Sequence, residues 1–199
     1  MKKYNANDPA AVEAVAKCLL EGGVAVIPTE TVYGIVTRYD NEAGYDRIYA
    51  MKRRPASKRL QMLAPSLECA IDNGVRDTPE IRNLARHFWP GALTVVALNR
   101  TEDDSIGLRI PDHPFVLNVL QCCGTVLAAT SANRSGEPAA INFEDAIADL
   151  DGEPDVAVDG GTITAVGQAS TVVSLLNSAP AIIREGKISL DELKKALFG

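Results

Sequence analysis

The sequence has few of the residues that hold small metal-bound or disulfide-bonded proteins together. It contains two histidines and four cysteines in 199 residues, and no Cys-x-x-Cys spacing occurs. This composition argues against a structural zinc site and against a disulfide framework. We therefore expect buried, unreactive thiols at Cys18, Cys69, Cys122 and Cys123.

Long apolar runs are also absent. No run approaches the roughly 18 residues that a membrane-spanning helix needs. Residues 1–8 turn polar where a secretory signal peptide would become apolar. We expect a cytoplasmic protein that does not contact a membrane.

Several sequence motifs of common enzymes are missing. The chain has no Gly-x-x-x-x-Gly-Lys-Ser/Thr, no Gly-x-Gly-x-x-Gly and no Gly-x-Ser-x-Gly. These absences argue against a P-loop, a dinucleotide-binding turn and a hydrolase nucleophile elbow. His87 and His113 lie far apart in the sequence, so a histidine-based triad or metal site is not supported either. Any catalysis must then depend on positioning and charge rather than on a nucleophilic side chain.

The charge pattern favours a small anionic ligand. With 26 acidic and 20 basic residues the net charge is −6, so no global positive field is available to hold a polyanion such as tRNA. Aromatic residues make up only 5%, which leaves few stacking platforms for single-stranded RNA. Five basic residues nevertheless cluster within eight positions: Lys52, Arg53, Arg54, Lys58 and Arg59. Alternatively, this cluster is a solvated helix end that complements the helix dipole.

The pattern of apolar residues and breakers predicts a single domain over residues 1–199. Apolar spacing and capping residues predict helices at 8–20, 41–54, 78–88, 111–120, 142–150 and 189–197. Short apolar runs predict strands at 24–27, 60–64, 92–98, 105–110, 126–129, 156–158, 170–175 and 181–184. Helices and strands alternate without strict βαβ regularity, which indicates an α/β fold with a twisted mixed sheet and packed helices.

Two polar stretches follow predicted strands and are candidates for a binding site. Residues 28–35 (Pro-Thr-Glu-Thr-Val-Tyr-Gly-Ile) follow the strand that ends at Ile27, and a long polar loop at 130–138 follows another strand. Hydroxyls and amides of these loops, together with arginines that grip carboxylates and phosphates, could bind a nucleotide and a small carboxylate. Each residue also has a structural alternative. Residues 28–35 could be a plain hairpin, Arg109 a paired surface arginine, Arg184 a sheet-edge cap, and Ser131 and Asn133 turn residues.

Taken together, seven motifs resemble the YrdC family of threonylcarbamoyl-AMP synthases. They occur in order across nearly the whole chain, at residues 28–34, 52–55, 89–94, 107–114, 131–136, 170–173 and 183–186. The resemblance implies the YrdC/RibB-like fold with an open, positively charged cavity. The chain resembles the short, single-domain form of the family, since the sequence stops at Gly199.

The resemblance also implies a reaction and its substrates. A nucleotidyltransferase of this family forms threonylcarbamoyl-AMP and pyrophosphate from L-threonine, bicarbonate and ATP, as the first step toward threonylcarbamoyladenosine in tRNA. Both reactants are anions, so cationic groups must offset their repulsion and hold them in line. Mg²⁺ is expected with ATP, held mainly by the nucleotide and not by a protein metal site. Downstream tRNA-modification proteins are possible partners, and any tRNA contact is expected to be weak or indirect.

The family motifs assign roles to individual residues. Lys52 and Arg54 match the catalytic Lys-x-Arg pair, and Thr31, Arg109 and Ser170 match threonine-binding positions. The positions that match nucleotide-binding residues are Arg54, Lys58, Ser105, Ser131, Asn133 and Arg184. Arg53, Leu63 and Ile141 depart from the common residues at their positions. We expect the side chains of Lys52 and Arg54 to be exposed, so that replacing either by alanine abolishes activity and leaves the melting temperature within a few degrees.

Two other functions stay open at this point. The chain could be a member of the YciO branch with a different activity, although that branch alters the Lys-x-Arg and Ser-Ala-Asn motifs, which are intact here. It could also be a module that binds RNA on its concave face. Threonine-dependent release of pyrophosphate from ATP would separate the synthase from both.

Overall fold

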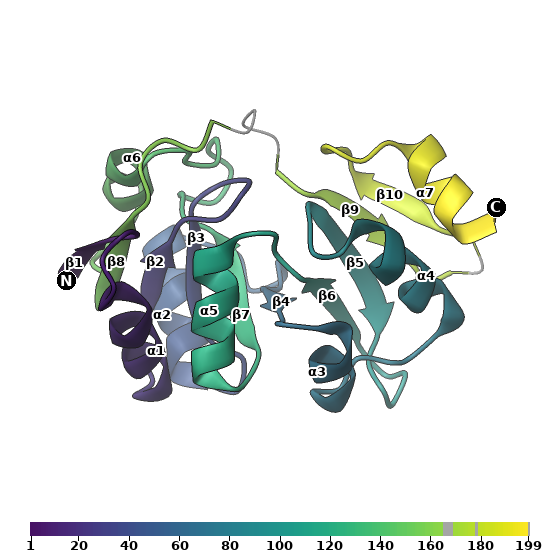
Figure 1. The fold of residues 1–199 in the computed structure, drawn as a ribbon, viewed down its shortest axis with the longest axis horizontal. Helices are drawn as coiled ribbons and strands as arrows, with labels where there is room; N and C mark the ends of the chain where they lie inside the picture. Colours follow the sequence, from purple (N-terminus) through teal and green to yellow (C-terminus); the bar gives the residue numbers. More distant parts are fainter. Residues whose placement is uncertain (165–168, 178, 199) are drawn as a thin grey trace.

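The protein is described here from a computed structural model that covers residues 1–164, 169–177 and 179–198. Ten strands form one sheet in the order β1-β8-β2-β3-β7-β4-β6-β5-β9-β10 (Figure 1). The strands are β1 (Lys2–Asn5), β2 (Ala25–Ile27), β3 (Gly34–Arg38), β4 (Gln61–Leu63), β5 (Leu93–Leu98), β6 (Ser105–Arg109), β7 (Leu127–Ser131), β8 (Val156–Asp159), β9 (Thr171–Ser174) and β10 (Ala181–Arg184). Parallel and antiparallel pairs occur together, which confirms the mixed sheet.

Apart from α3, the helices lie where the sequence predicts them, with shifts at their ends. They are α1 (Ala11–Leu20), α2 (Glu42–Lys52), α3 (Leu67–Asp72), α4 (Pro79–Phe88), α5 (Pro114–Cys123), α6 (Phe143–Ala148) and α7 (Leu190–Phe198). The side chains of Asn41, Thr78 and Asn142 each accept a hydrogen bond from a backbone N–H in the first turn that follows. These caps explain why α2, α4 and α6 begin where they do.

The sequence interpretation missed three elements and misplaced one. Strands β1 and β3 and the short helix α3 were not predicted. Since β3 pairs antiparallel with β2, residues 28–33 do connect a hairpin, as the structural alternative held. Helix α5 begins at Pro114 and not at Pro111, because the N–H of Asp112 donates to the carboxylate of Glu30 and the chain is still extended there.

The expectation of four buried thiols was also wrong. Cys122 is exposed and Cys69 is half-buried, while Cys18 and Cys123 lie in the core. Burial raises the pKa of both core thiols to about 11, so these two are unreactive. Cys122 lies near the end of α5, where the helix face turns from the core toward solvent.

In one half of the molecule, helices cover both faces of the sheet. Ala25 and Ile27 pack in a hydrophobic cluster with α1 and α5, whereas Val26 packs in another with α2 and α6. Successive residues of a strand point to opposite faces, so this alternation explains the two layers. Figure 1 shows α1 and α5 in front of this part of the sheet and α2 behind it.

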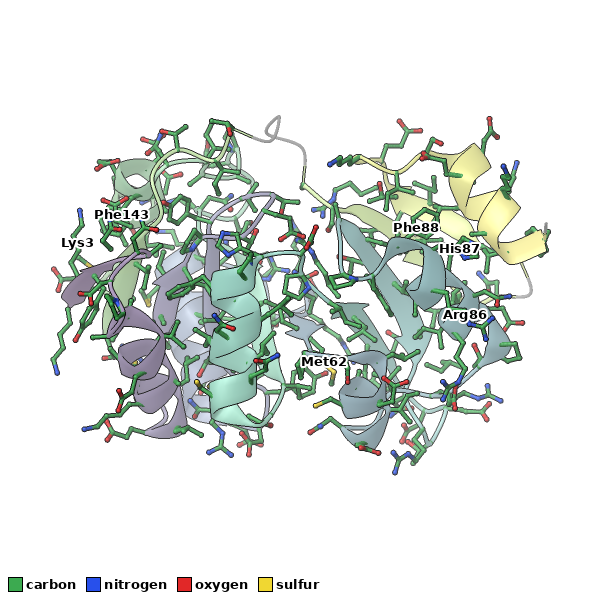
Figure 2. The ribbon with its side chains drawn as sticks, in the orientation of Figure 1. Lys3, Met62, Arg86, His87, Phe88 and Phe143 are labelled. Carbon is green, nitrogen blue, oxygen red and sulfur yellow. The ribbon has the colours of Figure 1, made fainter. Side chains whose placement is uncertain are left out.

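In the other half, helices α3, α4 and α7 share a single cluster with the sheet. Met62, Val95 and Leu108 pack toward these helices, and Figure 2 shows Met62 between the two halves of the molecule. Their neighbours Gln61 and Thr94 turn to the opposite face. That face forms the floor of the cavity described below. None of the helices in the described part of the chain has the length and apolar character needed to cross a bilayer.

Candidate functional site

A cavity of about 450 Å³ lies on this face of the sheet. Its floor comes from strands β4 to β7 and β9, and its walls come from the loop after α2, the end of β7 and strand β10. Five of the predicted site residues line it: Arg54, Lys58, Ser105, Ser131 and Arg184. No aspartate or glutamate of the described residues does so. The cavity is therefore positively charged, although the whole chain carries a net charge of −6.

Lys52 lies behind the cavity wall, which corrects the expectation that it is exposed. Its side chain is only 1% exposed, and its Nζ donates hydrogen bonds to the carbonyls of Ser131 and Asn133. Burial, and then the nearby charge of Arg54, lower the pKa of Lys52 to about 7. Lys52 thus fastens the loop after β7 to the end of α2.

The loop after β7 is held together by its own amide groups. The Nδ2 of Asn133 donates to the carbonyls of Arg134 and Glu137 at 2.9 and 2.8 Å. The N–H of Ser135 donates to the carbonyl of Lys52 at 2.8 Å. Asn133 does hold a turn, as the structural alternative proposed. Its Oδ1, however, is buried and accepts no hydrogen bond from the described residues, so it is free to accept one from a bound molecule.

Arg54 is fixed by the loop that follows it. Its Nε and Nη2 donate to the carbonyls of Lys58 and Arg59, both at 2.8 Å. The hydroxyl of Tyr49 donates to the same Lys58 carbonyl at 3.0 Å. Burial lowers the pKa of Arg54, as expected for a guanidinium that has no carboxylate partner among the described residues.

At the other side of the site, Arg109 is buried and paired. Its Nη2 donates to Glu30 Oε1 at 2.6 Å and to Thr31 Oγ1 at 3.0 Å, and its Nε donates to the Gly91 carbonyl. Arg109 is only 4% exposed, so it is paired but is not a surface arginine. Its Nη1 makes no hydrogen bond to the described residues and is the group left to bind a carboxylate.

The sequence interpretation assigned no role to Glu30. Its Oε1 also accepts from the N–H of Asp112 at 3.0 Å, and its Oε2 is buried without a partner among the described residues. The position of Glu30 between Thr29 and Thr31, in a stretch already suspected of binding, was the available signal. Its partner Arg109 lies 79 positions away, which no local pattern reveals.

Arg184 and Ser170 form one unit. The Nη2 of Arg184 donates to the carbonyl and hydroxyl oxygens of Ser170, at 2.9 and 3.2 Å. The Ser170 hydroxyl is 2.8 Å from that of Thr94, which donates to Gln61 on the cavity floor. Burial and then the charge of Arg109 lower the pKa of Arg184. Through its bonds to Ser170, Arg184 does cap the sheet edge, as the structural alternative proposed. Its side chain also lines the cavity.

The structure therefore brings the predicted residues together, though not all in the cavity wall. Lys52 and Asn133 stand behind Ser131, and Thr31 precedes the lining residue Val32. Of the three departures, Leu63 is 2% exposed in the core and Arg53 turns away from the cavity to pair with Asp151. The backbone of Ile141 bonds to Ile163. The part of the chain that the structure describes contains no group of three or more acidic, histidine or cysteine side chains arranged to hold a metal ion.

Comparisons with known proteins agree with this arrangement. The family model Sua5_yciO_yrdC, described as telomere recombination, matches residues 17–186. The threonylcarbamoyl-AMP synthase of Bacillus subtilis is 32% identical over 98% of this chain and 58% of its own length. The crystal structure of Pyrococcus abyssi Sua5 complexed with L-threonine matches with a TM-score of 0.86 and 31% identity, over 94% of this chain and 57% of that one.

A further solved structure shares the fold alone. The chain matches Escherichia coli YciO with a TM-score of 0.82 and 19% identity, over 96% of this chain and 97% of that one. The shared fold is thus a single α/β domain with a mixed sheet and packed helices. The chain spans less than two thirds of the length of the Bacillus and Pyrococcus relatives.

Proposed function

The chain belongs to the Sua5–YciO–YrdC family, and on that premise we propose that it is a threonylcarbamoyl-AMP synthase. Its substrates would be ATP, L-threonine and bicarbonate, and its products threonylcarbamoyl-AMP and pyrophosphate. The relatives that carry this name, and the Sua5 structure that holds L-threonine, support the proposal. The product would serve as the activated donor for tRNA modification.

One observation carries this proposal from the side of the structure. Lys52, Arg54 and Arg184 hydrogen-bond only to carbonyl and hydroxyl oxygens among the described residues. These acceptors fix the side chains without neutralising their charge. Arg54 and Arg184 line the cavity, Lys52 lies behind its wall, and no carboxylate of the described residues belongs to the lining, which suits a ligand with several negative charges, such as a triphosphate.

The reaction requires two anions to meet. The amine of threonine and bicarbonate would form a carbamate with loss of water, and a carbamate oxygen would then attack the α-phosphorus of ATP. The bond between the α-phosphorus and the bridging oxygen breaks, and pyrophosphate leaves. Positive groups around the phosphates reduce the repulsion between nucleophile and electrophile, and the rigid loops hold the two in line.

The residues divide this work by position. Arg54, Lys58 and Arg184 line the cavity and would bind the phosphates, while Ser105 and Ser131 would complete the oxygen shell of the nucleotide. Arg109 Nη1 would bind the carboxylate of threonine, with Thr31 and Ser170 close by. Lys52 would act through its charge and by holding the loop, since its Nζ must leave two carbonyls before it can contact a ligand.

Mg²⁺ would accompany ATP. Its preferred ligands are oxygens, and the cavity lining of the described residues offers hydroxyls but no carboxylate. These residues fit a metal ion that the phosphates of ATP would carry into the site, with the hydroxyls of the lining as the available oxygen groups. The ion would neutralise part of the triphosphate charge.

Pyrophosphate release from ATP tests the proposal. The purified chain is incubated with ATP and Mg²⁺, with threonine and bicarbonate added singly or together, and the adenylate is identified by mass spectrometry. We expect release only when all substrates are present. Release that does not respond to threonine would reject the synthase and favour a YciO-like activity. RNA binding without any release would favour the binding module.

A further inference from the structure

One carboxylate outside the cavity joins two segments that carry site residues, the end of α2 and the loop after β7. Asp151, in the turn after α6, accepts a hydrogen bond from Arg53 on one oxygen and from Arg134 at 2.7 Å on the other. Arg53 stands between Lys52 and Arg54 at the end of α2, and Arg134 follows Asn133 in the loop after β7. The backbone N–H of Asp151 donates to the Met51 carbonyl at 2.7 Å.

We propose that Asp151 is a positioning residue that fixes the loop after β7 against the end of α2 and thereby sets the affinity of the site for ATP. The Arg53–Asp151–Arg134 bridge does not touch the cavity. It acts through the segments it connects, one carrying Lys52 and Arg54 and the other carrying Asn133. The ATP part of this inference rests on the proposed function, whereas the effect on the loop does not.

Three features of the bridge support this role. The carboxylate is shared by two guanidinium groups from different segments, and its side chain is 32% exposed, so it is partly shielded from water. The Nε of Arg134 is buried without a partner among the described residues, which leaves the bond to Asp151 to hold its guanidinium. Both guanidinium groups hold the pKa of Asp151 below its usual value, so the carboxylate is ionised at neutral pH.

The backbone of Arg53 adds a separate argument. Arg53 ends α2 with φ at 47°, a left-handed conformation that glycine adopts without strain and that other residues adopt at a cost. Arg53 adopts this conformation despite its cost in free energy, and the side chain of Arg53 forms the bridge to Asp151. Replacing Arg53 by glycine therefore removes the bridge and relieves the backbone at the same time.

The first variant is Asp151→Asn, with Asp155→Asn as its matched control. The carboxylate of Asp155 also accepts from an arginine, Arg47 of α2, and from a backbone N–H, but it contacts no residue of the loop. Hydrogen exchange is followed at the N–H of Ser135, which donates to the Lys52 carbonyl, and ATP binding is measured by calorimetry without threonine or bicarbonate. We expect Asp151→Asn to speed the exchange of Ser135 about tenfold and to weaken ATP binding about fivefold, and Asp155→Asn to change neither.

The second variant separates positioning from stability. Arg53→Gly should keep or raise the melting temperature, because strain is relieved, and should still speed Ser135 exchange and weaken ATP binding. Unchanged exchange in both variants would overturn the inference, as would faster exchange with unchanged ATP affinity. If the unaltered chain bound no ATP, the proposed function would fail, and Ser135 exchange alone would decide whether the bridge holds the loop.

Discussion

The cavity and the outer surface of this molecule hold their cationic side chains in opposite ways. On the surface, Arg38, Arg47 and Arg82 each form an ion pair with an aspartate. Around the cavity, Arg54 and Arg184 hydrogen-bond to carbonyl and hydroxyl oxygens, which carry no net charge. Both kinds of bond fix the geometry of the side chain, but only the first cancels its charge.

The difference is what the proposed binding of a polyanionic nucleotide to an acidic chain would require. No carboxylate of the described residues belongs to the lining, and carbonyls accept from its cations instead, so a local positive potential survives on a chain with net charge −6. Arg109 is one exception, since Glu30 balances it. We associate that balanced pair with threonine, whose charges also cancel, and the unbalanced cations with the phosphates.

The largest expected effect comes from removing the buried cation. Lys52→Ala takes the donor away from one buried and one partly buried carbonyl and leaves a void, so we expect the free energy of unfolding to fall by about 2 kcal/mol. Pyrophosphate release should fall at least about 100-fold, in the range seen when a preorganised charge is lost. Denaturant unfolding and the release assay measure the two effects.

Lys58→Ala is the matched control for this change. Lys58 also belongs to the cavity wall, but it is exposed and makes no ion pair among the described residues. Its removal should leave the free energy of unfolding nearly unchanged and lower activity less. Equal stability of the two variants would show that Lys52 does not fasten the loop.

The next effect is a dependence of stability on pH. The pKa of Lys52 is about 7 in the folded chain, lowered by burial and by Arg54 and slightly raised by Asp149, against an ordinary value of 10.5. Between these values the unfolded chain binds more protons than the folded chain, so the free energy of unfolding rises with pH. The rise is lost below about pH 7, where both states are protonated.

A difference curve isolates this contribution. Unfolding of the unaltered chain is compared with that of Lys52→Met from pH 7 to 9, so that other titrating groups cancel. We expect the difference to grow by about 1 kcal/mol per pH unit. The surface pair of Arg47 and Asp155 changes stability in the same direction but in the acidic range: the pKa of Asp155 is lowered, so the stability from its pairing is lost as the pH falls below the ordinary value of an aspartate. A flat difference curve would mean that Lys52 is not desolvated.

A carboxylate introduced into the cavity should cancel part of its positive charge, as aspartates cancel the charge of the surface arginines. Gln61→Glu keeps the oxygen that accepts from Thr94 and adds one negative charge to the floor. We expect ATP binding to weaken about tenfold, which corresponds to about 1.4 kcal/mol. Gln121→Glu on the exposed side of α5 adds the same charge outside the cavity and should leave the Kd unchanged. An equal loss in both variants would point to net charge instead of cavity charge.

The sequence predicted the helices and strands better than it predicted which cationic side chains are buried or paired with a carboxylate. A short apolar run predicted the strand around Thr94 and Val95, because that pattern is local. The family motifs predicted which cations gather. The burial of Lys52 and the pairing of Arg109 with Glu30 depend on contacts across 79 positions, and a motif does not show whether a cation is neutralised. The start of α5 was misplaced for the same reason, since Glu30 occupies the N–H of Asp112.

The smallest expected effect comes from a cation that belongs to both regions. Arg59 lines the cavity, yet it forms an ion pair with Asp104, as surface arginines do. Asp104→Asn should free this charge for the phosphates and tighten ATP binding about two- to threefold, a modest gain because both partners are largely exposed. Asp40→Asn, which frees Arg38 away from the cavity, is the control and should leave the Kd unchanged. Asp104→Asn could have no effect on the Kd while Gln61→Glu still weakens binding. ATP affinity would then fall with added negative charge but would not rise with added positive charge. The carbonyl-bound cations would in that case act through their fixed geometry more than through the electrostatic potential they create.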